Sequence, residues 1–153
     1  MDFPDLPLDE APEEPVSFHF EDIRFDLPDT ERLTQWLLSV AGTEGKPFFE
    51  LNFIFCSDEH LREINVKYLD HDYYTDVITF PYAEGIIHGD VFISSERVSE
   101  NALTNGVTFL QELRRVMVHS VLHLAGYGDK SPEEETLMRA KEQFYLNIYD
   151  ATN

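Results

Sequence analysis

The sequence has 153 residues, of which 42% are hydrophobic and 13% aromatic, enough for one domain with a core that needs no metal or disulfide. No apolar run approaches the ~18 residues of a membrane span, and the first ten residues lack the basic and apolar stretches of a signal peptide. Eleven basic and 30 acidic residues give a net charge of −19, which by itself opposes nucleic acid binding. The single cysteine, Cys56, excludes an internal disulfide, and we expect a cytoplasmic protein without membrane association.

The first fifteen residues differ in composition from the rest of the chain. They contain six acidic residues, no basic residue and four of the eight prolines. Such a segment buries too little apolar surface to offset the entropy lost on ordering. We therefore predict an acidic, proline-rich tail or loosely docked arm at residues 1–15, followed by a single domain at residues 16–150.

Four strands are expected where apolar residues alternate with polar ones. Val16, Phe18 and Phe20 form the first such series, with polar residues between them. The alternation indicates strands that bury one side chain in two. The other three predicted strands span residues 49–55, 76–80 and 86–93.

Five helices are expected from apolar residues at helical spacing and from residues that favour helix ends. The first begins at Pro28-Asp-Thr-Glu and is predicted to stop at Gly42. The second begins at Ser57 or Asp58, both good capping residues, and runs to Leu69. The remaining three are predicted from Ser94 or Ser95 to Gly106, from Thr108 to Ala125, and from Ser131 to about Asn147.

This element order, βαβαββααα, indicates an α/β fold. Strands connected through helices pair in parallel, whereas the short link between the third and fourth strands favours antiparallel pairing. We therefore predict a mixed four-stranded sheet, with three strands parallel and one antiparallel, packed by about five helices.

A possible metal site lies at the end of the fourth predicted helix. His119 and His123 are one turn apart on the same helix face, where two imidazoles can reach one ion. Gly126 can adopt the left-handed conformation that reverses the chain, so the carboxylate of Asp129 can return over that face. Two nitrogens and one oxygen suit Zn²⁺ with an open fourth position.

Three motifs are similar to those of a known family. The stretch from His119 to Asp129, HSVLHLAGYGD, resembles the signature H-G-x-L-H-L-x-G-Y-D-H of the YbeY family. TDVITFP, at residues 75–81, resembles the family's T-D-V-L-S-F-P, and GDVFI, at residues 89–93, resembles its G-D-I-x-I strand. The motifs occur in the family's order, and the matching element order extends over about residues 16–145.

The resemblance implies a metal-dependent endoribonuclease that acts in ribosomal RNA maturation and ribosome assembly. It implies that His119, His123 and Asp129 hold one Zn²⁺ per chain, with water in the fourth position. The implied partners are ribosomal RNA and the ribosome or its assembly factors, and no DNA is expected.

The chain departs from the family pattern at three positions. Asp129 stands where the family usually has a third histidine. Ser120 replaces the glycine that follows the first histidine of the family signature. The family's arginine before T-D-V, proposed to act on phosphate, is Leu69 here. Because this guanidinium is missing, a non-hydrolytic, metal-stabilised ribosome-assembly factor is an alternative. A metalloprotease is less favoured, because Ser120 occupies the position of the glutamate base in H-E-x-x-H enzymes.

Other polar residues are less easily assigned. The sequence identifies no general base. His71, near the position of the missing arginine, is a weak catalytic candidate. Glu112 is another residue whose side chain could act as a base. Asp76 and Asp90, beside central strands, are expected to be hydrogen-bonded structural groups or to shape the cleft. A local basic patch could bind RNA despite the net charge. The candidates for that patch are Lys67, Arg114 and Arg115.

Overall fold

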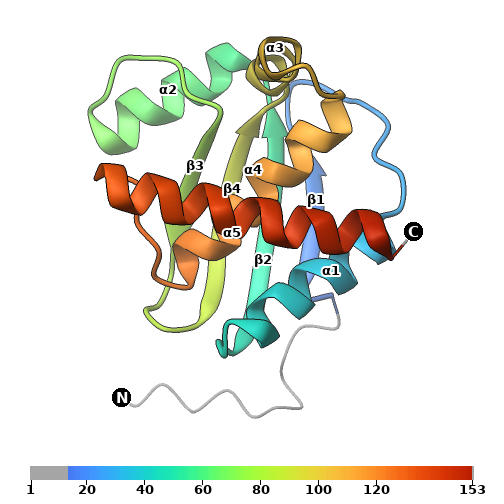
Figure 1. Ribbon diagram of the computed structural model, residues 1–153. Coiled ribbons are helices and arrows are strands. Elements are labelled where there is room, and N and C mark those ends of the chain that lie inside the picture. The colour runs from blue at the N-terminus through green and yellow to red at the C-terminus, as the bar shows by residue number, and fades with distance from the viewer. Residues whose placement is uncertain (1–13, 153) are drawn as a thin grey trace.

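The computed structural model describes residues 14–152, so most of the predicted tail lies outside the described residues. The strands are β1 (Val16–Phe20), β2 (Phe48–Cys56), β3 (Val77–Pro81) and β4 (Ile87–Ser94). The helices are α1 (Thr30–Thr43), α2 (Asp58–Leu69), α3 (Ser95–Asn105), α4 (Phe109–Leu124) and α5 (Pro132–Ala151). The strands form one sheet in the order β1-β2-β4-β3, in which only β3 is antiparallel to its neighbour (Figure 1). The predicted element order and the mixed sheet are confirmed.

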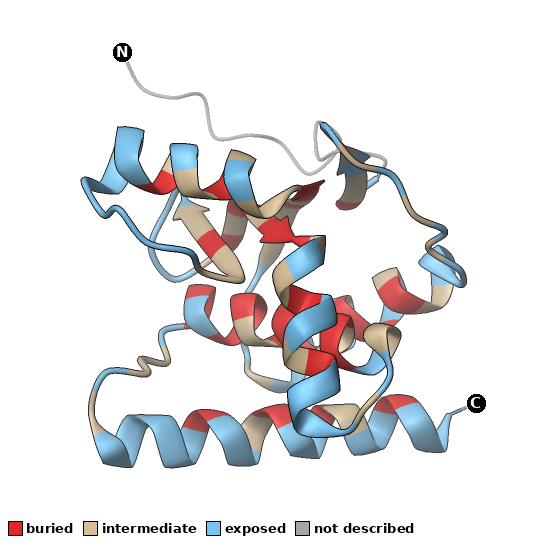
Figure 2. Cartoon of the chain, turned by 90° about the horizontal axis from the view of Figure 1, so that it is seen from above, coloured by how far each residue is buried: buried red, intermediate tan, exposed pale blue. Residues whose placement is uncertain are grey.

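The sheet is covered on both faces, but unequally. Val91 and Ile93 of β4 face a large core that α1, α4 and α5 complete. Phe92 faces the opposite way, into a small cluster with Cys56 and Leu61 under α2. Figure 2, seen from above, shows α5 outermost, α4 between α5 and the sheet, and α2 beyond the sheet. Polar side chains between α4 and α5 are therefore shielded from water.

Two helix ends differ from the prediction. α1 continues past Gly42 and is capped by Glu44, and Gly45, with a φ of +72°, reverses the chain. The predicted stop at Gly42 is wrong because a glycine ends a helix only where the backbone turns left-handed. α5 extends to Ala151, beyond the predicted end, because Tyr149 continues its buried stripe.

The antiparallel pair β3–β4 requires an unusually close approach of two backbones. A Cβ at Gly89 of β4 would lie 2.6 Å from the carbonyl oxygen of Phe80 in β3, so glycine is needed there. β3 is an edge strand and ends at Pro81, which has no N–H for a further partner. Within residues 14–152, no helix is both long and apolar enough to cross a membrane.

Candidate metal centre

α4 positions the two histidines. The helix begins with a capping box, in which the side chains of Thr108 and Gln111 each accept a hydrogen bond from the other residue's backbone N–H. Its apolar residues pack between α1, α5 and the sheet. His119 and His123 border this apolar stripe and line a cleft, and their side chains are 19% and 37% exposed. A rigid, well-capped helix therefore presents both imidazoles to the cleft.

The turn after α4 brings the third side chain back. Gly126 has a φ of +113°, so its predicted left-handed backbone is confirmed. The backbone N–H of Gly126 donates to the carbonyl of His123, and that of Tyr127 donates to the carbonyl of Leu122, each at 3.0 Å. These bonds satisfy carbonyls at the helix end and direct the following residues over the helix face, where Asp129 lies.

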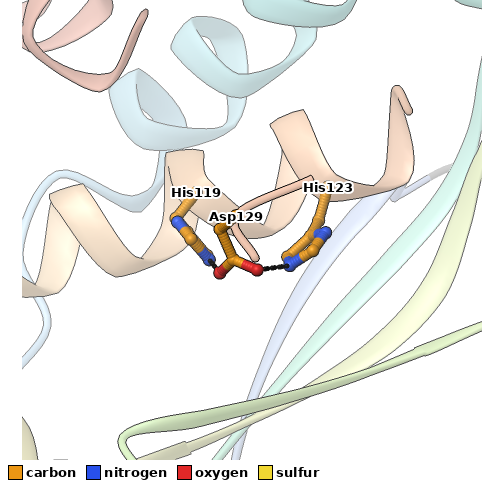
Figure 3. Close-up of side chains that lie close together, drawn as sticks. All are labelled: His119, His123 and Asp129. Carbon is orange, nitrogen blue, oxygen red and sulfur yellow. Dashed lines mark ion pairs between the residues drawn. The ribbon is translucent and has the colours of Figure 1, made fainter. Parts of the chain in front are cut away.

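The three side chains converge (Figure 3). Nε2 of His119 lies 3.3 Å from Oδ2 of Asp129, and Nε2 of His123 lies 3.5 Å from Oδ1 of the same carboxylate. One ligand atom from each residue lies within 4.8 Å of the others. Two imidazole nitrogens and one carboxylate oxygen are a donor set that suits Zn²⁺. The residues present therefore fit a transition metal ion.

A buried carboxylate from α5 lies behind the first histidine. Oε2 of Glu142 is 2.7 Å from Nδ1 of His119, and Oε1 of Glu142 is 3.2 Å from Nη1 of Arg115. Burial lowers the pKa of His119, but the hydrogen bond and charge of Glu142, with smaller contributions from Asp129 and Asp76, outweigh it. The pKa of His119 in the ion-free protein is therefore raised above its ordinary value.

The cleft above the histidines has a volume of about 1450 Å³ and is lined from several elements. Four basic and six acidic side chains line it, so its charge is nearly balanced although the chain carries −19. Leu69 and His71 lie on its wall, and His71 is exposed, with Nδ1 3.0 Å from the hydroxyl of Tyr73.

The predicted basic patch does not assemble as expected. Arg115 lines the cleft, but Arg114 lies over the ring of Tyr149, 4.6 Å from its centroid, and Lys67 lies beside Tyr68 on α2. Neighbours in sequence point to different sides of α4, which explains why Arg114 and Arg115 separate. The other basic residues that line the cleft are Lys46, Lys130 and Arg139.

The residues considered for protease chemistry are directed elsewhere. Ser120 is fully buried, and its hydroxyl donates to the carbonyl of Val116 at 3.0 Å. Glu112 is 3% exposed, and its carboxylate lies 3.3 Å from Nε of Arg115. Neither belongs to the group that could hold a metal ion among residues 14–152. The position of a protease base is therefore occupied by a core serine.

The two strand aspartates have different surroundings. Asp90 accepts hydrogen bonds from Nδ2 of Asn52, at 3.0 Å, and from the hydroxyl of Tyr82, so it is the structural group expected. Asp76 lines the cleft. Burial raises the pKa of Asp76, and backbone hydrogen bonds and the nearby His119 offset only part of that effect. Asp76 is therefore a poorly solvated acid beside the proposed metal ligands.

Sequence reasoning missed Glu142, although a signal was present. The buried residues of α5 are Met138, Glu142, Tyr145 and Tyr149, which follow helical spacing along one stripe. A glutamate in an apolar stripe is unusual, because a carboxylate is almost never fully buried without a partner. The residue type and its register could have marked Glu142 as a paired group, but not its partner.

Comparisons with known proteins identify the family of the chain. A family model described as endoribonuclease YbeY matches residues 16–150. The endoribonuclease YbeY of Cytophaga hutchinsonii is 46% identical over 138 residues, covering 89% of this chain and 96% of that protein. The corresponding protein of Flavobacterium psychrophilum is 49% identical over 135 residues, covering 88% and 96%. The solution structure of TM1509 from Thermotoga maritima aligns with a TM-score of 0.63 at 27% identity, covering 88% of each chain. The chain therefore belongs to the endoribonuclease YbeY family.

Proposed function

We propose that this protein is a metal-dependent endoribonuclease that acts in ribosomal RNA maturation, in the cytoplasm and in association with the ribosome or its assembly factors. The observation that carries the proposal is the convergence of His119, His123 and Asp129 at one wall of a large cleft. Relatives named endoribonuclease YbeY, at 42–49% identity over most of the chain, support RNA as the substrate.

The proposed cofactor is one Zn²⁺ per chain, held by Nε2 of His119, Nε2 of His123 and a carboxylate oxygen of Asp129. Their spacing and their mixture of nitrogen and oxygen donors favour this ion. When bound, Zn²⁺ acts as a Lewis acid and makes a water molecule acidic near neutral pH. The carboxylate of Asp129 adds a negative charge that the usual third histidine would not, so it lowers the net positive charge of the site.

The chain's own residues bind and orient the RNA. Lys130 and Arg139 are exposed in the cleft, and Arg115 is partly exposed there. We assign contacts with backbone phosphates to these three side chains, because cationic side chains position nucleic acids mainly through phosphate. His71 is our candidate for moving a proton at the cleft wall, since its imidazole lines the cleft and is exposed to solvent.

One observation favours the second candidate function, a ribosome-assembly factor without hydrolytic activity. Leu69, 42% exposed on the cleft wall, occupies the position of an arginine that the YbeY family uses toward phosphate. An aliphatic side chain cannot neutralise charge that develops on a phosphate. If the other cationic side chains do not replace it, RNA binding survives without cleavage.

Metal analysis and RNA cleavage test the proposal together. Protein purified without a histidine tag is expected to contain about one zinc per chain and to cleave ribosomal RNA precursor. His123→Ala removes a proposed ligand and should lose both properties. His19→Ala, an exposed histidine on β1, is the matched control and should keep both.

The outcomes distinguish the candidates. Zinc in the wild type without cleavage of authentic precursor would favour the assembly factor. Absence of zinc from freshly prepared wild type, with no uptake on titration, would contradict the metal site itself. Cleavage that persists in metal-free protein and in His123→Ala would contradict the metal-dependent mechanism.

A further inference from the structure

Glu142 makes a contact that the proposed function does not yet use. Its side chain is 3% exposed, yet both carboxylate oxygens have partners. Oε2 lies 2.7 Å from Nδ1 of His119, and Oε1 lies 3.2 Å from Nη1 of Arg115. The carboxylate therefore connects α5 to two positions one turn apart on α4.

We propose that Glu142 is a positioning residue that fixes the tautomer of His119. This inference rests on the proposed function, because the other ring nitrogen is a proposed metal ligand. An ionised carboxylate only accepts hydrogen bonds, so the contact requires a proton on Nδ1 of His119. In the neutral ring, Nε2 then carries the free lone pair. That nitrogen faces Asp129, where the ion would be held.

Arg115 determines how the amide group would be oriented if glutamine replaced Glu142. Its guanidinium only donates hydrogen bonds, and it contacts Oε1 of Glu142. In a Glu142→Gln variant, Arg115 would retain the amide oxygen at the position of Oε1. The amide nitrogen would then occupy the position of Oε2 and donate to Nδ1 of His119. This arrangement places the ring proton on Nε2, the wrong nitrogen for binding a metal ion.

A buried ion pair that only stabilises the core would have different consequences, and the chain contains such a pair for comparison. Glu112 is also 3% exposed, and its Oε1 lies 3.3 Å from Nε of the same Arg115. The same oxygen accepts a hydrogen bond from Nδ2 of Asn105, at 3.4 Å. Glu112 forms no hydrogen bond or ion pair with His119. Glu112→Gln therefore changes the same buried cluster without touching the imidazole.

The first experiment measures Zn²⁺ affinity by competition with a chelating dye. Loss of a carboxylate that orients a ligating histidine typically weakens metal binding by about 10–100-fold, which we expect for Glu142→Gln. Glu112→Gln should bind like the wild type, and thermal unfolding of the ion-free variants checks that each is folded. Equal affinities for Glu142→Gln and the wild type overturn the positioning role. A wild type that binds no Zn²⁺ overturns the proposed metal site as well.

The second experiment can overturn the proposal with the wild type alone. Nitrogen-15 NMR of the ion-free wild type, at a pH where His119 is neutral, reports which ring nitrogen carries the proton. The proposal expects protonated Nδ1 in the wild type and in Glu112→Gln, and protonated Nε2 in Glu142→Gln. Predominantly protonated Nε2 in the wild type overturns the proposal, whatever the metal affinities are.

Discussion

The carboxylates of Glu44 and Glu142 are both largely buried, and both take part in contacts of α5. They differ in the residues to which they are hydrogen-bonded. Glu44, at the end of α1, accepts hydrogen bonds from the hydroxyls of Tyr127 and Tyr145 and from Nζ of Lys141. Glu142 bonds to Arg115 and His119. The two tyrosines that bond to Glu44 pack in or against the main hydrophobic core. The imidazole beside Glu142, in contrast, has a second nitrogen that faces the cleft.

The comparison shows how the same buried group serves stability or a site. Both side chains are under one-tenth exposed and both are paired, so burial and pairing do not distinguish them. The pKa of Glu44 is lowered: burial raises it, but hydrogen bonds from two tyrosines and a lysine more than compensate. What distinguishes Glu142 is a partner that can transmit orientation to another atom. A buried carboxylate beside a histidine is therefore a better guide to function than a buried carboxylate alone.

The largest effect on stability is expected at Glu44. Glu44→Ala leaves two phenol hydroxyls and a lysine without their common acceptor, and should lower the free energy of unfolding by about 3 kcal/mol. The Zn²⁺ affinity of the folded variant should stay close to that of the wild type. Chemical denaturation and dye competition measure the two quantities. A large loss of affinity without a loss of stability would reverse the roles of the two carboxylates.

Gly126 couples the two regions, because its turn carries Tyr127 toward Glu44 and Asp129 toward the histidines. Gly126→Val forces a β-branched residue to a φ of +113°, and should lower the free energy of unfolding by about 2 kcal/mol and weaken Zn²⁺ binding. Gly42→Val is the control, because Gly42 has an ordinary helical φ and no atom within 4 Å of the added Cβ. Equal behaviour of the two variants in denaturation and metal titration would contradict the strain argument.

Local features of this fold were predictable, because they depend on nearby residues. Ser94, Thr108 and Ser131 cap the helices expected from them, and the left-handed backbone at Gly126 follows from a glycine at a helix end. The convergence of His119, His123 and Asp129 was predictable for the same reason. Whether they bind a metal ion stays a prediction.

Long-range features were not predictable from local patterns. The position of β4 between β2 and β3 depends on how whole layers pack, which no short stretch encodes. The pairing of Glu142 with His119 joins two residues that are 23 positions apart in sequence and lie on different helices. The separation of Arg114 from Arg115 depends on which side of α4 meets α5 and which lines the cleft.

Asp129 lies next to the ring nitrogen of His119 that does not contact Glu142, and its replacement tests the charge of the proposed metal site. Asp129→His should retain Zn²⁺, because the family usually has histidine there, and it adds one unit of positive charge to the loaded site. That charge favours loss of a proton from a group bound to the ion, so the pH midpoint of RNA cleavage should fall by about one unit. The measurement is the pH profile of cleavage with metal content determined in parallel. An unchanged or higher midpoint with zinc retained would contradict this role of Asp129.

The smallest effect on stability is expected at Asp76. Unlike Glu44 and Glu142, its carboxylate has no side-chain hydrogen-bond partner among the described residues. Its folded pKa is raised, so the ion-free protein loses stability as pH rises from the unfolded value near 3.9 through the folded value. Asp76→Asn should remove this loss and raise the free energy of unfolding at pH 8 by less than about 1 kcal/mol. Below the unfolded value the gain should vanish.

The matched control for Asp76 is Asp90 on β4. Asp90→Asn should lower stability at pH 8, because it weakens hydrogen bonds from Asn52 and Tyr82. Denaturation curves at several pH values compare the two variants. A loss of stability for both variants at pH 8 would show that burial of Asp76 carries no free-energy penalty.

The three proposed ligands lie within eleven residues of one another, and this closeness has a thermodynamic consequence. A cross-link over so short a loop removes little conformational freedom from the unfolded chain. The unfolded chain also keeps the same three side chains near one another, so it retains some affinity for the ion. Binding to the unfolded state reduces the shift in melting temperature that an ion produces. Zinc should therefore raise the melting temperature by less than its affinity for the folded protein alone would give.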